Sequence, residues 1–502
     1  MTPGMLILAA ILIPVAGALV IPLFRNAPNA REAVTLVTAG LLFLTVVNSL
    51  LAFLAGMKME VNVWQVTPAL ALAFRIEPLG MLFALVASTL WIVNSDYSIG
   101  YMRGHNEPRQ TPFYVCFAVA LAATMGLAFS ANLFSLFIFY ELLTLSTYPL
   151  VAHSRTPEGM RGGRIYLCML LGSSLLLLLP AILITYGLTG TLDFTQGGIL
   201  DGKATGVVMG LLLALYAFGI GKAGLMPGHF WLPAAMVAPT PVSALLHAVA
   251  VVKAGVFCIL KVVVYIFGID TLRQSGQSEW LIFMASFTIL AASIVAMMQD
   301  NLKKRLAYST VSQLSYIVLA AALATQASII GGGMHIVMHA AGKITLFFCA
   351  GAIYVAHHKT EISQLDGLGH KMPFTFAAFL IGSLSIIGLP PFGGVWSKWA
   401  ISVGALDAGY TFAVIVLMVS SLLNVAYLLP IVGRGFFRPA PADGDGHRGG
   451  GHGSAGSGIA EAPLACVVPL CITAGLCLVL FFFPDQLEAL IKLAFVNSGG
   501  AQ

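Results

Sequence analysis

Long apolar runs separated by short polar stretches repeat along almost the whole chain. An α-helix needs about 20 apolar residues to cross a bilayer, and most of these runs are close to that length. The pattern predicts about 14 transmembrane helices, which we expect at residues 4–24, 33–57, 78–101, 113–130, 132–152, 164–188, 206–226, 241–267, 279–298, 311–325, 328–356, 373–397, 408–433 and 463–484. The chain is therefore expected to be an all-α polytopic membrane protein.

The distribution of basic residues predicts which way this bundle is oriented. Most of the 25 Lys and Arg residues fall in loops on one side of the predicted helices. The loops on the other side hold only Lys58, Arg75, Lys203, Arg273 and Lys492. Because cytoplasmic loops carry the excess of Lys and Arg, both termini are expected on the outer side of the membrane.

Composition agrees with a membrane protein and excludes several function classes. The chain is 59% hydrophobic and 9% charged, whereas soluble domains average about 25% charged residues. Its seven cysteines lie in apolar runs and form no CxxC pair, which argues against Fe–S, zinc and disulfide sites. The sequence contains no phosphate-binding loop and no dinucleotide fingerprint. We therefore expect no cofactor, no metal and no nucleic-acid partner.

Five charged residues stand out within the apolar runs or at their edges. Glu141 is an acid in the middle of 132–152, and the bases Lys222, Lys253, Lys343 and Lys398 each lie in or at the edge of a different run. A lone charge at bilayer depth costs several kcal/mol or more unless it is paired. One buried acid with several buried bases indicates a charge relay or an ion path.

Two of the charged segments also contain helix-breaking residues. Lys222 precedes Pro227 and His229, and Lys398 follows Pro390 and Pro391. Proline removes a backbone donor and clashes with the preceding turn, so helices should break there. Breaks at membrane depth are tolerated where they line protein or a water-filled cavity, and paired breaks are typical of inverted-repeat transporters. Simple packing kinks are the alternative interpretation.

Histidines accompany the lysines in two further segments. His247 and Lys253 are six residues apart, so they should lie on roughly opposite faces of 241–267. Lys261, nearer the outer edge, is expected to reach the membrane surface with its ammonium group.

His335, His339 and Lys343 are spaced i, i+4, i+8 and form one stripe along 328–356. A proton relay is favoured because imidazole titrates near neutrality. Zinc binding and structural core histidines remain alternatives. The polar run STVSQLSY (309–316) either hydrates a link between the two halves or starts a helix capped by serine.

Taken together, five motifs resemble those of the antiporter-like subunits shared by respiratory complex I, membrane-bound hydrogenases and Mrp-type antiporters. They are FYELLTLSTYPLVA around Glu141, GKAGLMPGHFWLPAAMVAPTPVSALLHAVAVVKAGVF (221–257), DNLKKRLAYSTVSQLSY (300–316), MHIVMHAAGKITLFFCAGAI (334–353) and GLPPFGGVWSKW (388–399). The size and the ending are most similar to the MrpD-type chain of these antiporters, and the lysine at position 398 is unlike the middle antiporter-like chain of complex I.

The resemblance implies a domain organisation with two inverted five-helix repeats and broken seventh and twelfth helices. The expected parts are N-terminal helices (1–112), a first repeat (113–267), a second repeat (279–436), a flexible Gly/His-rich cytoplasmic linker (437–462) and a last helix with its tail (463–502). A solvated linker is favoured there over a metal site formed by His447 and His452.

The resemblance also implies roles for residues and partners. Glu141 and Lys222 look like the glutamate–lysine pair of the first half-channel, and Lys398 like the terminal residue of the second. His247 and Lys253 look like connecting positions, and His335, His339 and Lys343 look like the central relay.

The implied function is proton translocation by a subunit of a hetero-oligomeric Mrp-type sodium/proton antiporter in a prokaryotic inner membrane. Such a chain is an ion transporter subunit and not itself an enzyme, with other membrane subunits, lipid, protons and Na⁺ as partners. A pump subunit of complex I or a hydrogenase is the first alternative, and a non-transporting scaffold is the second.

Overall fold

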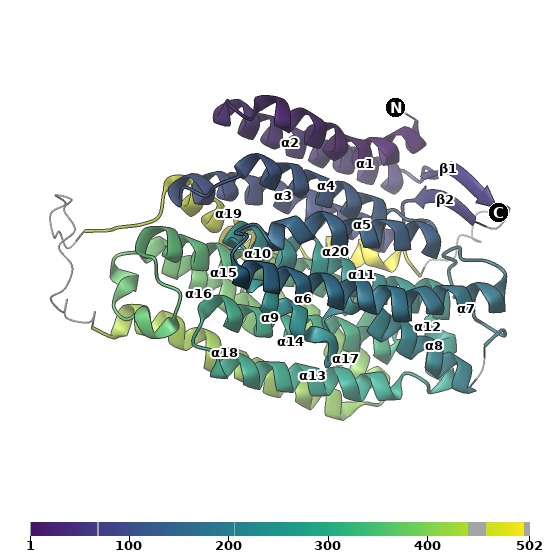
Figure 1. Cartoon of the computed structure of the whole chain (residues 1–502). Coiled ribbons are helices and arrows are strands. Elements are labelled where there is room, and N and C mark those ends of the chain that lie inside the picture. Colours follow the sequence, from purple (N-terminus) through teal and green to yellow (C-terminus); the bar gives the residue numbers. More distant parts are fainter. Residues whose placement is uncertain (1, 68–69, 205, 440–457, 496–502) are drawn as a thin grey trace.

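The structure is a computed structural model of the 502-residue chain, and it describes residues 2–67, 70–204, 206–439 and 458–495. Helices pack side by side in one elongated bundle, with a β-hairpin at one end (Figure 1). Within the described residues, 11 helices are long and apolar enough to cross a membrane, or up to 12 if one bent pair counts as a span. The prediction of a helical polytopic protein is confirmed, whereas the count of about 14 is not.

The N-terminal part contains the hairpin that the hydrophobic pattern did not predict. Its elements are α1 (Pro3–Val20), η1 (Ile21–Phe24), α2 (Pro28–Leu54), β1 (Glu60–Thr67), β2 (Leu70–Arg75) and α3 (Pro78–Gly104). β1 and β2 pair antiparallel, with Glu60 opposite Arg75. The alternating residues of EVNVWQVT are typical of a strand, but the segment is short and lies between two long apolar runs.

The middle of the chain contains the first broken helix. Its elements are α4 (Gln110–Ala128), α5 (Leu133–Val151), α6 (Pro157–Ser173), η2 (Ser174–Leu178), α7 (Leu179–Thr189), α8 (Gly206–Gly219), η3 (Gly221–Ala223), η4 (Gly228–Phe230), α9 (Trp231–Ala234), η5 (Ala235–Val237), α10 (Thr240–Ala244), η6 (Leu245–Val249), α11 (Val251–Val262), η7 (Val263–Phe267) and α12 (Ile269–Ser275). Regular α-helix therefore stops at Gly219, before Pro227 is reached. The segment η6–α11–η7 ends at Gly268, where the axis turns by 82° into α12.

The C-terminal part contains the second broken helix. Its elements are α13 (Glu279–Met298), α14 (Leu302–Leu323), α15 (Gln326–His357), η8 (Ile362–Gln364), η9 (Leu368–His370), α16 (Pro373–Ile387), α17 (Gly394–Asp407), α18 (Thr411–Phe437), α19 (Leu464–Phe482) and α20 (Pro484–Lys492). Pro390 and Pro391 lie between α16 and α17, as the sequence predicted. Residues 440–457, which include His447, His452 and most of the predicted linker, lie outside the described residues.

Local sequence signals explain where several helices begin. The side chain of Asn132 accepts a hydrogen bond from the Ser135 backbone at the start of α5, and Asn301 caps α14 in the same way. Thr325 and Ser328 form a reciprocal capping box at the start of α15. These caps satisfy backbone N–H groups that have no partner inside the helix. The polar run 309–316 is therefore the middle of α14 and not a serine-capped start.

One end of the bundle, the hairpin end, is built from β1, β2 and the segments 129–132, 193–200 and 265–268. Backbone hydrogen bonds join these segments, including Arg75 to Phe129 and Ile199 to Ile266. Gly4 lies beside Val61, and Gln196 donates to the carbonyl of Ala494, so both ends of the described chain reach this end. The chain therefore crosses the bundle an even number of times.

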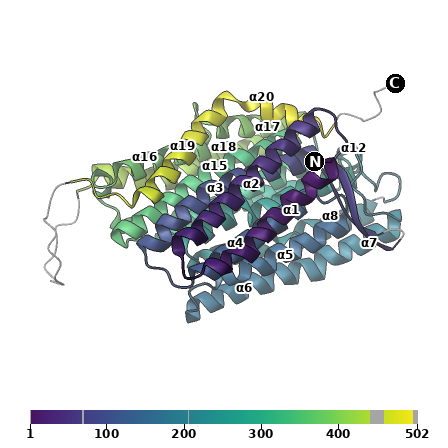
Figure 2. The same ribbon diagram turned by 90° about the horizontal axis from the view of Figure 1, so that it is seen from above.

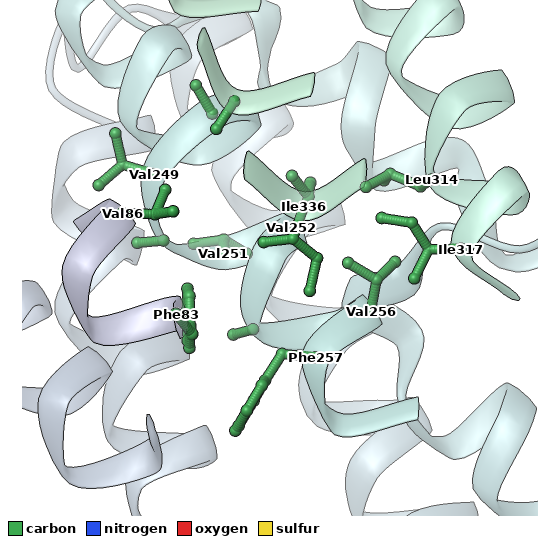
Figure 3. Close-up of a cluster of buried hydrophobic side chains, with 14 of the residues drawn as sticks. Phe83, Val86, Val249, Val251, Val252, Val256, Phe257, Leu314, Ile317 and Ile336 are labelled. Atoms are coloured by element: carbon green, nitrogen blue, oxygen red, sulfur yellow. The ribbon is translucent and has the colours of Figure 1, made fainter. Parts of the chain in front are cut away.

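The centre of the bundle is α15, which contacts α3, α14, α16, α17 and α19 and has a completely buried apolar span. It lies among the other helices in both views (Figures 1 and 2). Figure 3 shows apolar side chains of α3, α11, α14 and α15 meeting around Val252 and Ile336. Large apolar residues on the outer helices, such as Leu44, Phe287 and Leu422, are instead exposed. This arrangement is expected for a bundle whose outer surface faces lipid.

The glycine run Gly331–Gly332–Gly333 explains how neighbours approach α15 so closely. A Cβ added at Gly331 would lie 2.7 Å from the backbone nitrogen of Ile401 in α17. At Gly333 it would lie 2.9 Å from the side chain of Ile491 in α20. Small residues at helix contacts let membrane helices pack through close van der Waals contact. The run therefore serves helix packing.

A buried row of lysine and histidine side chains

Lys222 sits in the break after α8 and is completely buried. Its ammonium group donates to the carbonyl of Tyr140 at 2.9 Å and to the hydroxyl of Thr144 at 2.6 Å, both on α5. It also lies 3.1 Å from the centroid of the Tyr140 ring. Gly255 of α11 lets the broken segment pack closely, since a Cβ there would come within 2.3 Å of the Lys222 backbone.

Glu141 follows Tyr140 on α5, next to the turn that holds Lys222. Both of its carboxylate oxygens are buried and neither makes a hydrogen bond in the described structure. The groups that act on this carboxylate are the charge of Lys222 and the nearby hydroxyl of Ser174. The ion pairs of the described residues do not include Glu141 with Lys222, so the expected pair is open in this structure.

Lys253 of α11 faces the histidine stripe of α15. Its ammonium nitrogen lies 2.5 Å from Nδ1 of His339. His339 in turn stacks on His335, with ring centroids 5.7 Å apart and an interplanar angle of 25°. The i, i+4 spacing predicted this stripe, and the structure places Lys253 at its middle.

His335 connects the stripe to the second broken helix. Its Nδ1 lies 2.9 Å from the hydroxyl of Ser397, and its Nε2 lies 3.1 Å from Oε1 of Gln313. Its ring stacks on Tyr316 with centroids 5.4 Å apart. Ser397 immediately precedes Lys398 in α17, so the histidine's partner is the direct chain neighbour of the next lysine.

Lys398 is buried where α16 ends and α17 begins. Its ammonium group donates to the carbonyl of Ile387 and to the hydroxyl of Ser421, each at 2.9 Å. Gly388 ends α16 with a φ of +86°, a conformation that favours glycine. A Cβ at Gly388 would also lie 2.9 Å from Cδ of Lys398. The break between α16 and α17 therefore leaves the Ile387 carbonyl able to accept from Lys398. The absence of a side chain at Gly388 leaves space for the Lys398 side chain.

Lys343 lies two turns along α15 from His335. It donates to the hydroxyl of Ser309 at 2.6 Å and to the carbonyl of Leu306 at 3.4 Å, both on α14. The hydroxyl of Tyr427 in α18 lies 2.8 Å from the same Ser309 hydroxyl and also within hydrogen-bond distance of Oδ1 of Asn424. The Ser309 hydroxyl of α14 thus connects Lys343 of α15 to Tyr427 of α18.

Lys222, Lys343 and Lys398 share one pattern, in which each ammonium contacts one main-chain carbonyl and one hydroxyl. A hydroxyl accepts a hydrogen bond from an ammonium and donates one to a neutral amine. A carbonyl only accepts. Each lysine therefore has a partner in both protonation states, which is what a group that gains and loses a proton requires.

The remaining predicted site residues lie away from these contacts. His229 is buried in η4, where its ring packs against Phe230 and Tyr308. His247 falls in η6, and its side chain lies outside the described residues. The described side chains contain no group of three His, Cys, Asp or Glu residues placed to hold a metal ion.

Sequence reasoning missed the hydroxyl partners Thr144, Ser309, Ser397 and Ser421. Only the run 309–316 stood out as polar, because single hydroxyls in apolar helices are common and bond to their own backbone. The expectation for Lys261 was wrong. This residue is fully buried and forms an ion pair with Glu77 at 3.1 Å.

Comparisons with known proteins place these residues in a family. The family model described as "NADH:quinone oxidoreductase/Mrp antiporter, TM" matches residues 130–424, a range that includes every lysine of the row. NADH-quinone oxidoreductase subunit N of Desulforudis audaxviator is 32% identical over 384 residues, which cover 75% of each chain. NAD(P)H-quinone oxidoreductase chain 5 of Synechocystis is 32% identical over 347 residues, covering 66% of this chain but about half (49%) of the relative.

Two solved structures share the fold over almost their whole length. A chain of the Mrp complex from Dietzia superposes with a TM-score of 0.85 at 23% identity, covering 99% of this chain and 98% of that one. A chain of an archaeal membrane-bound sulfane sulfur reductase gives 0.84 at 24% identity, covering 97% and 96%. The shared fold therefore extends beyond residues 130–424 to the described N-terminal and C-terminal helices.

Proposed function

The chain belongs to the NADH:quinone oxidoreductase/Mrp antiporter transmembrane family, and we propose that it is the proton-translocating subunit of a multi-subunit Mrp-type sodium/proton antiporter. Protons move along the buried row formed by Lys222, Lys253, His339, His335 and Lys398, with Lys343 beside it. The observation that carries the proposal is the pairing of three buried lysines with hydroxyl groups that serve either protonation state.

The gate of this path is the Glu141–Lys222 pair. When the carboxylate approaches the ammonium, mutual attraction favours the charged form of Lys222. When the pair is open, as here, burial without a counter-ion favours release of its proton. Moving one charge through 100 mV requires about 2.3 kcal/mol, so an ion pair worth a few kcal/mol is sufficient to control the direction of transfer.

The contacts of α15 give the order of transfer after the gate. Lys253 passes a proton to His339 through their direct contact, and the stacked His335 follows. Tyr316 then lies between His335 and Lys398, since its ring stacks on His335 and its centroid lies 5.1 Å from the Lys398 ammonium. Lys343 lies beside this path, on the same helix as His335 and His339, where its ammonium group donates to the hydroxyl of Ser309.

The coupling ion is expected to use other subunits. A sodium site requires several oxygen ligands, and Glu141 is the single carboxylate that the sequence places within the apolar runs carrying the row. Partner membrane subunits would supply a sodium path. We place the chain in a prokaryotic inner membrane with both termini, and hence the hairpin end, on the outer side, because the basic loops lie opposite.

A pumping subunit of a complex I-like enzyme is the second candidate, since curated relatives carry the names of NADH-quinone oxidoreductase subunits. Near-complete superposition on the Dietzia Mrp chain supports the antiporter proposal, although the sulfane sulfur reductase chain fits equally well. A scaffold without transport is disfavoured, because buried unpaired charges would cost stability without serving any purpose there.

Purification of the complex from native membranes tests the proposal. Small hydrophobic co-purifying subunits are expected, and the complex reconstituted in vesicles should move protons when Na⁺ is added. Co-purified flavin or Fe–S subunits would instead assign the chain to a redox complex. Vesicles that show neither Na⁺-dependent nor electron-transfer-dependent proton movement would refute both.

A further inference from the structure

Three charged side chains, of which Glu77 and Lys261 are buried and Arg75 is partly exposed, form a second cluster at the hairpin end, apart from the row. Arg75 of β2 donates to Oε1 of Glu77 through Nε at 3.2 Å and Nη2 at 2.8 Å. The ammonium of Lys261, from α11, lies 3.1 Å from Oε2 of the same carboxylate. Two cations therefore share one anion, and the cluster has a net charge of +1.

Lys222, Lys343 and Lys398 each contact a hydroxyl group, whereas the contacts of Lys261 are of other kinds. Besides Glu77 it donates to the carbonyl of Ser130, and it lies 4.2 Å from the centroid of the Phe194 ring. Carboxylates, carbonyls and aromatic faces all favour a cation, and none of them donates a hydrogen bond to a neutral amine. The contacts of Lys261 therefore serve its ammonium form only.

Arg75 stays charged for a similar reason. Burial by itself lowers the pKa of Arg75, but its contacts with Glu77 outweigh burial and raise the pKa above its ordinary value. The neighbouring Lys58 and Glu60 form an exposed ion pair at 3.0 Å and add no net charge. The three side chains of the cluster by themselves therefore carry a net charge of +1.

A cavity of about 940 Å³ opens next to the cluster. Arg75, Glu77 and the hydroxyl-bearing Tyr265 of η7 belong to its wall. Tyr265 is 2% exposed, and its hydroxyl is buried without a hydrogen-bond partner in the described structure. A cavity lined by charged groups and an unsatisfied hydroxyl is polar and large enough for water to enter.

The cluster lies between this cavity and the row. Lys261 follows Lys253 by eight residues on α11, a rise of about 12 Å toward the hairpin end. Cys258 lies between them on the same helix and is completely buried. Lys261 contacts Glu77 of the cavity wall and lies on the same helix as Lys253 of the row.

We propose that Arg75, Glu77 and Lys261 form an electrostatic plug that stops protons and other monovalent cations in the hairpin-end cavity from reaching the lysine row. A fixed positive charge in a narrow polar passage repels cations, as charged side chains do in selective pores. The proposal rests on the proposed transport function. It adds a specificity-determining site, because an antiporter must prevent passive backflow of protons.

Net charge, and not any single side chain, is the variable to test. Lys261→Met and Arg75→Met each reduce the cluster from +1 to neutral. Glu77→Gln raises it to +2, and the double variant Lys261→Met/Glu77→Gln restores +1 with Arg75 alone. The assembled complex carrying each variant is reconstituted in vesicles, and passive proton entry under a potassium diffusion potential is followed with a pH-sensitive dye in the absence of Na⁺.

Both neutral variants should leak protons faster than the wild type, by about tenfold or more, since one unit charge has been removed beside the passage. Glu77→Gln and the double variant should remain tight. Adding Lys222→Met to a neutral variant should abolish the leak by interrupting the row. If Lys261→Met does not assemble, Arg75→Met, which alters the more exposed partner, decides the question.

Two results would overturn the plug. One is a neutral variant that assembles and is as tight as the wild type. The other is a double variant that leaks as much as Lys261→Met, because a packing defect would then explain the leak. A wild-type complex without Na⁺-dependent proton movement would refute the proposed antiport separately, since passive leak is measured without Na⁺.

Discussion

Replacement of Thr144 by valine tests the proposal that a hydroxyl group next to a relay lysine lets that lysine change protonation state. The substitution keeps the shape of the side chain and removes the oxygen that lies 2.6 Å from the Lys222 ammonium. The carbonyl of Tyr140 remains as the second partner. Lys222 therefore keeps its position while it loses the partner that serves both of its forms.

The size of the effect follows from the difference between the two forms of Lys222. A hydrogen bond to a charged group contributes about 1.5–3 kcal/mol, and one between neutral groups contributes about 0.5–1.5 kcal/mol. Thr144→Val therefore disfavours the ammonium relative to the amine by about 1–1.5 kcal/mol. At about 1.4 kcal/mol per factor of ten, the ratio of charged to neutral Lys222 should change about five- to tenfold.

The assay is Na⁺-driven proton movement in vesicles that contain the reconstituted complex. We expect Thr144→Val to reduce the initial rate about five- to tenfold with normal assembly. Thr124→Val is the matched control, because the Thr124 hydroxyl is equally buried but bonds only to the carbonyl of Ala120 in its own helix. Equal rates in the two variants would refute the role assigned to the hydroxyl.

Three further predictions concern the gate, the break and the central relay. Glu141→Gln should abolish proton movement while the complex still assembles, and retained antiport would exclude the pair as the gate. Gly255→Ala should lower thermal stability by about 1–3 kcal/mol and reduce transport, because its Cβ displaces the Lys222 backbone. Gly228→Ala, where a Cβ would meet no atom within 4 Å, should match the wild type in a melting experiment. Lys343→Met should abolish transport without loss of thermal stability, since an apolar chain of similar length replaces a buried charge, and a variant that still transports would remove Lys343 from the path.

The hairpin end illustrates a feature that the sequence pattern concealed. The pattern predicts Arg75 in an outer loop and Lys261 at the membrane surface. The structure instead brings these two residues together with Glu77. Arg75 comes from strand β2, Lys261 from helix α11, and Glu77 directly precedes helix α3. Arg75 and Lys261 are far apart along the chain, and only the docking of the hairpin against α11 makes them neighbours.

The sequence by itself determined the helical class of the protein, both helix breaks and the identity of the row. The length of an apolar run reflects the thickness of the bilayer, and proline and glycine interrupt helices locally. The i, i+4 spacing places His335 and His339 on one helix face. Each of these features is a property of a single segment. The tertiary structure decided which groups meet across helices, including the hydroxyl partners, the contact of Lys253 with His339 and the open Glu141–Lys222 pair. Those contacts depend on the register and the distance between helices. Side chains from several segments set both together, so no single segment encodes them.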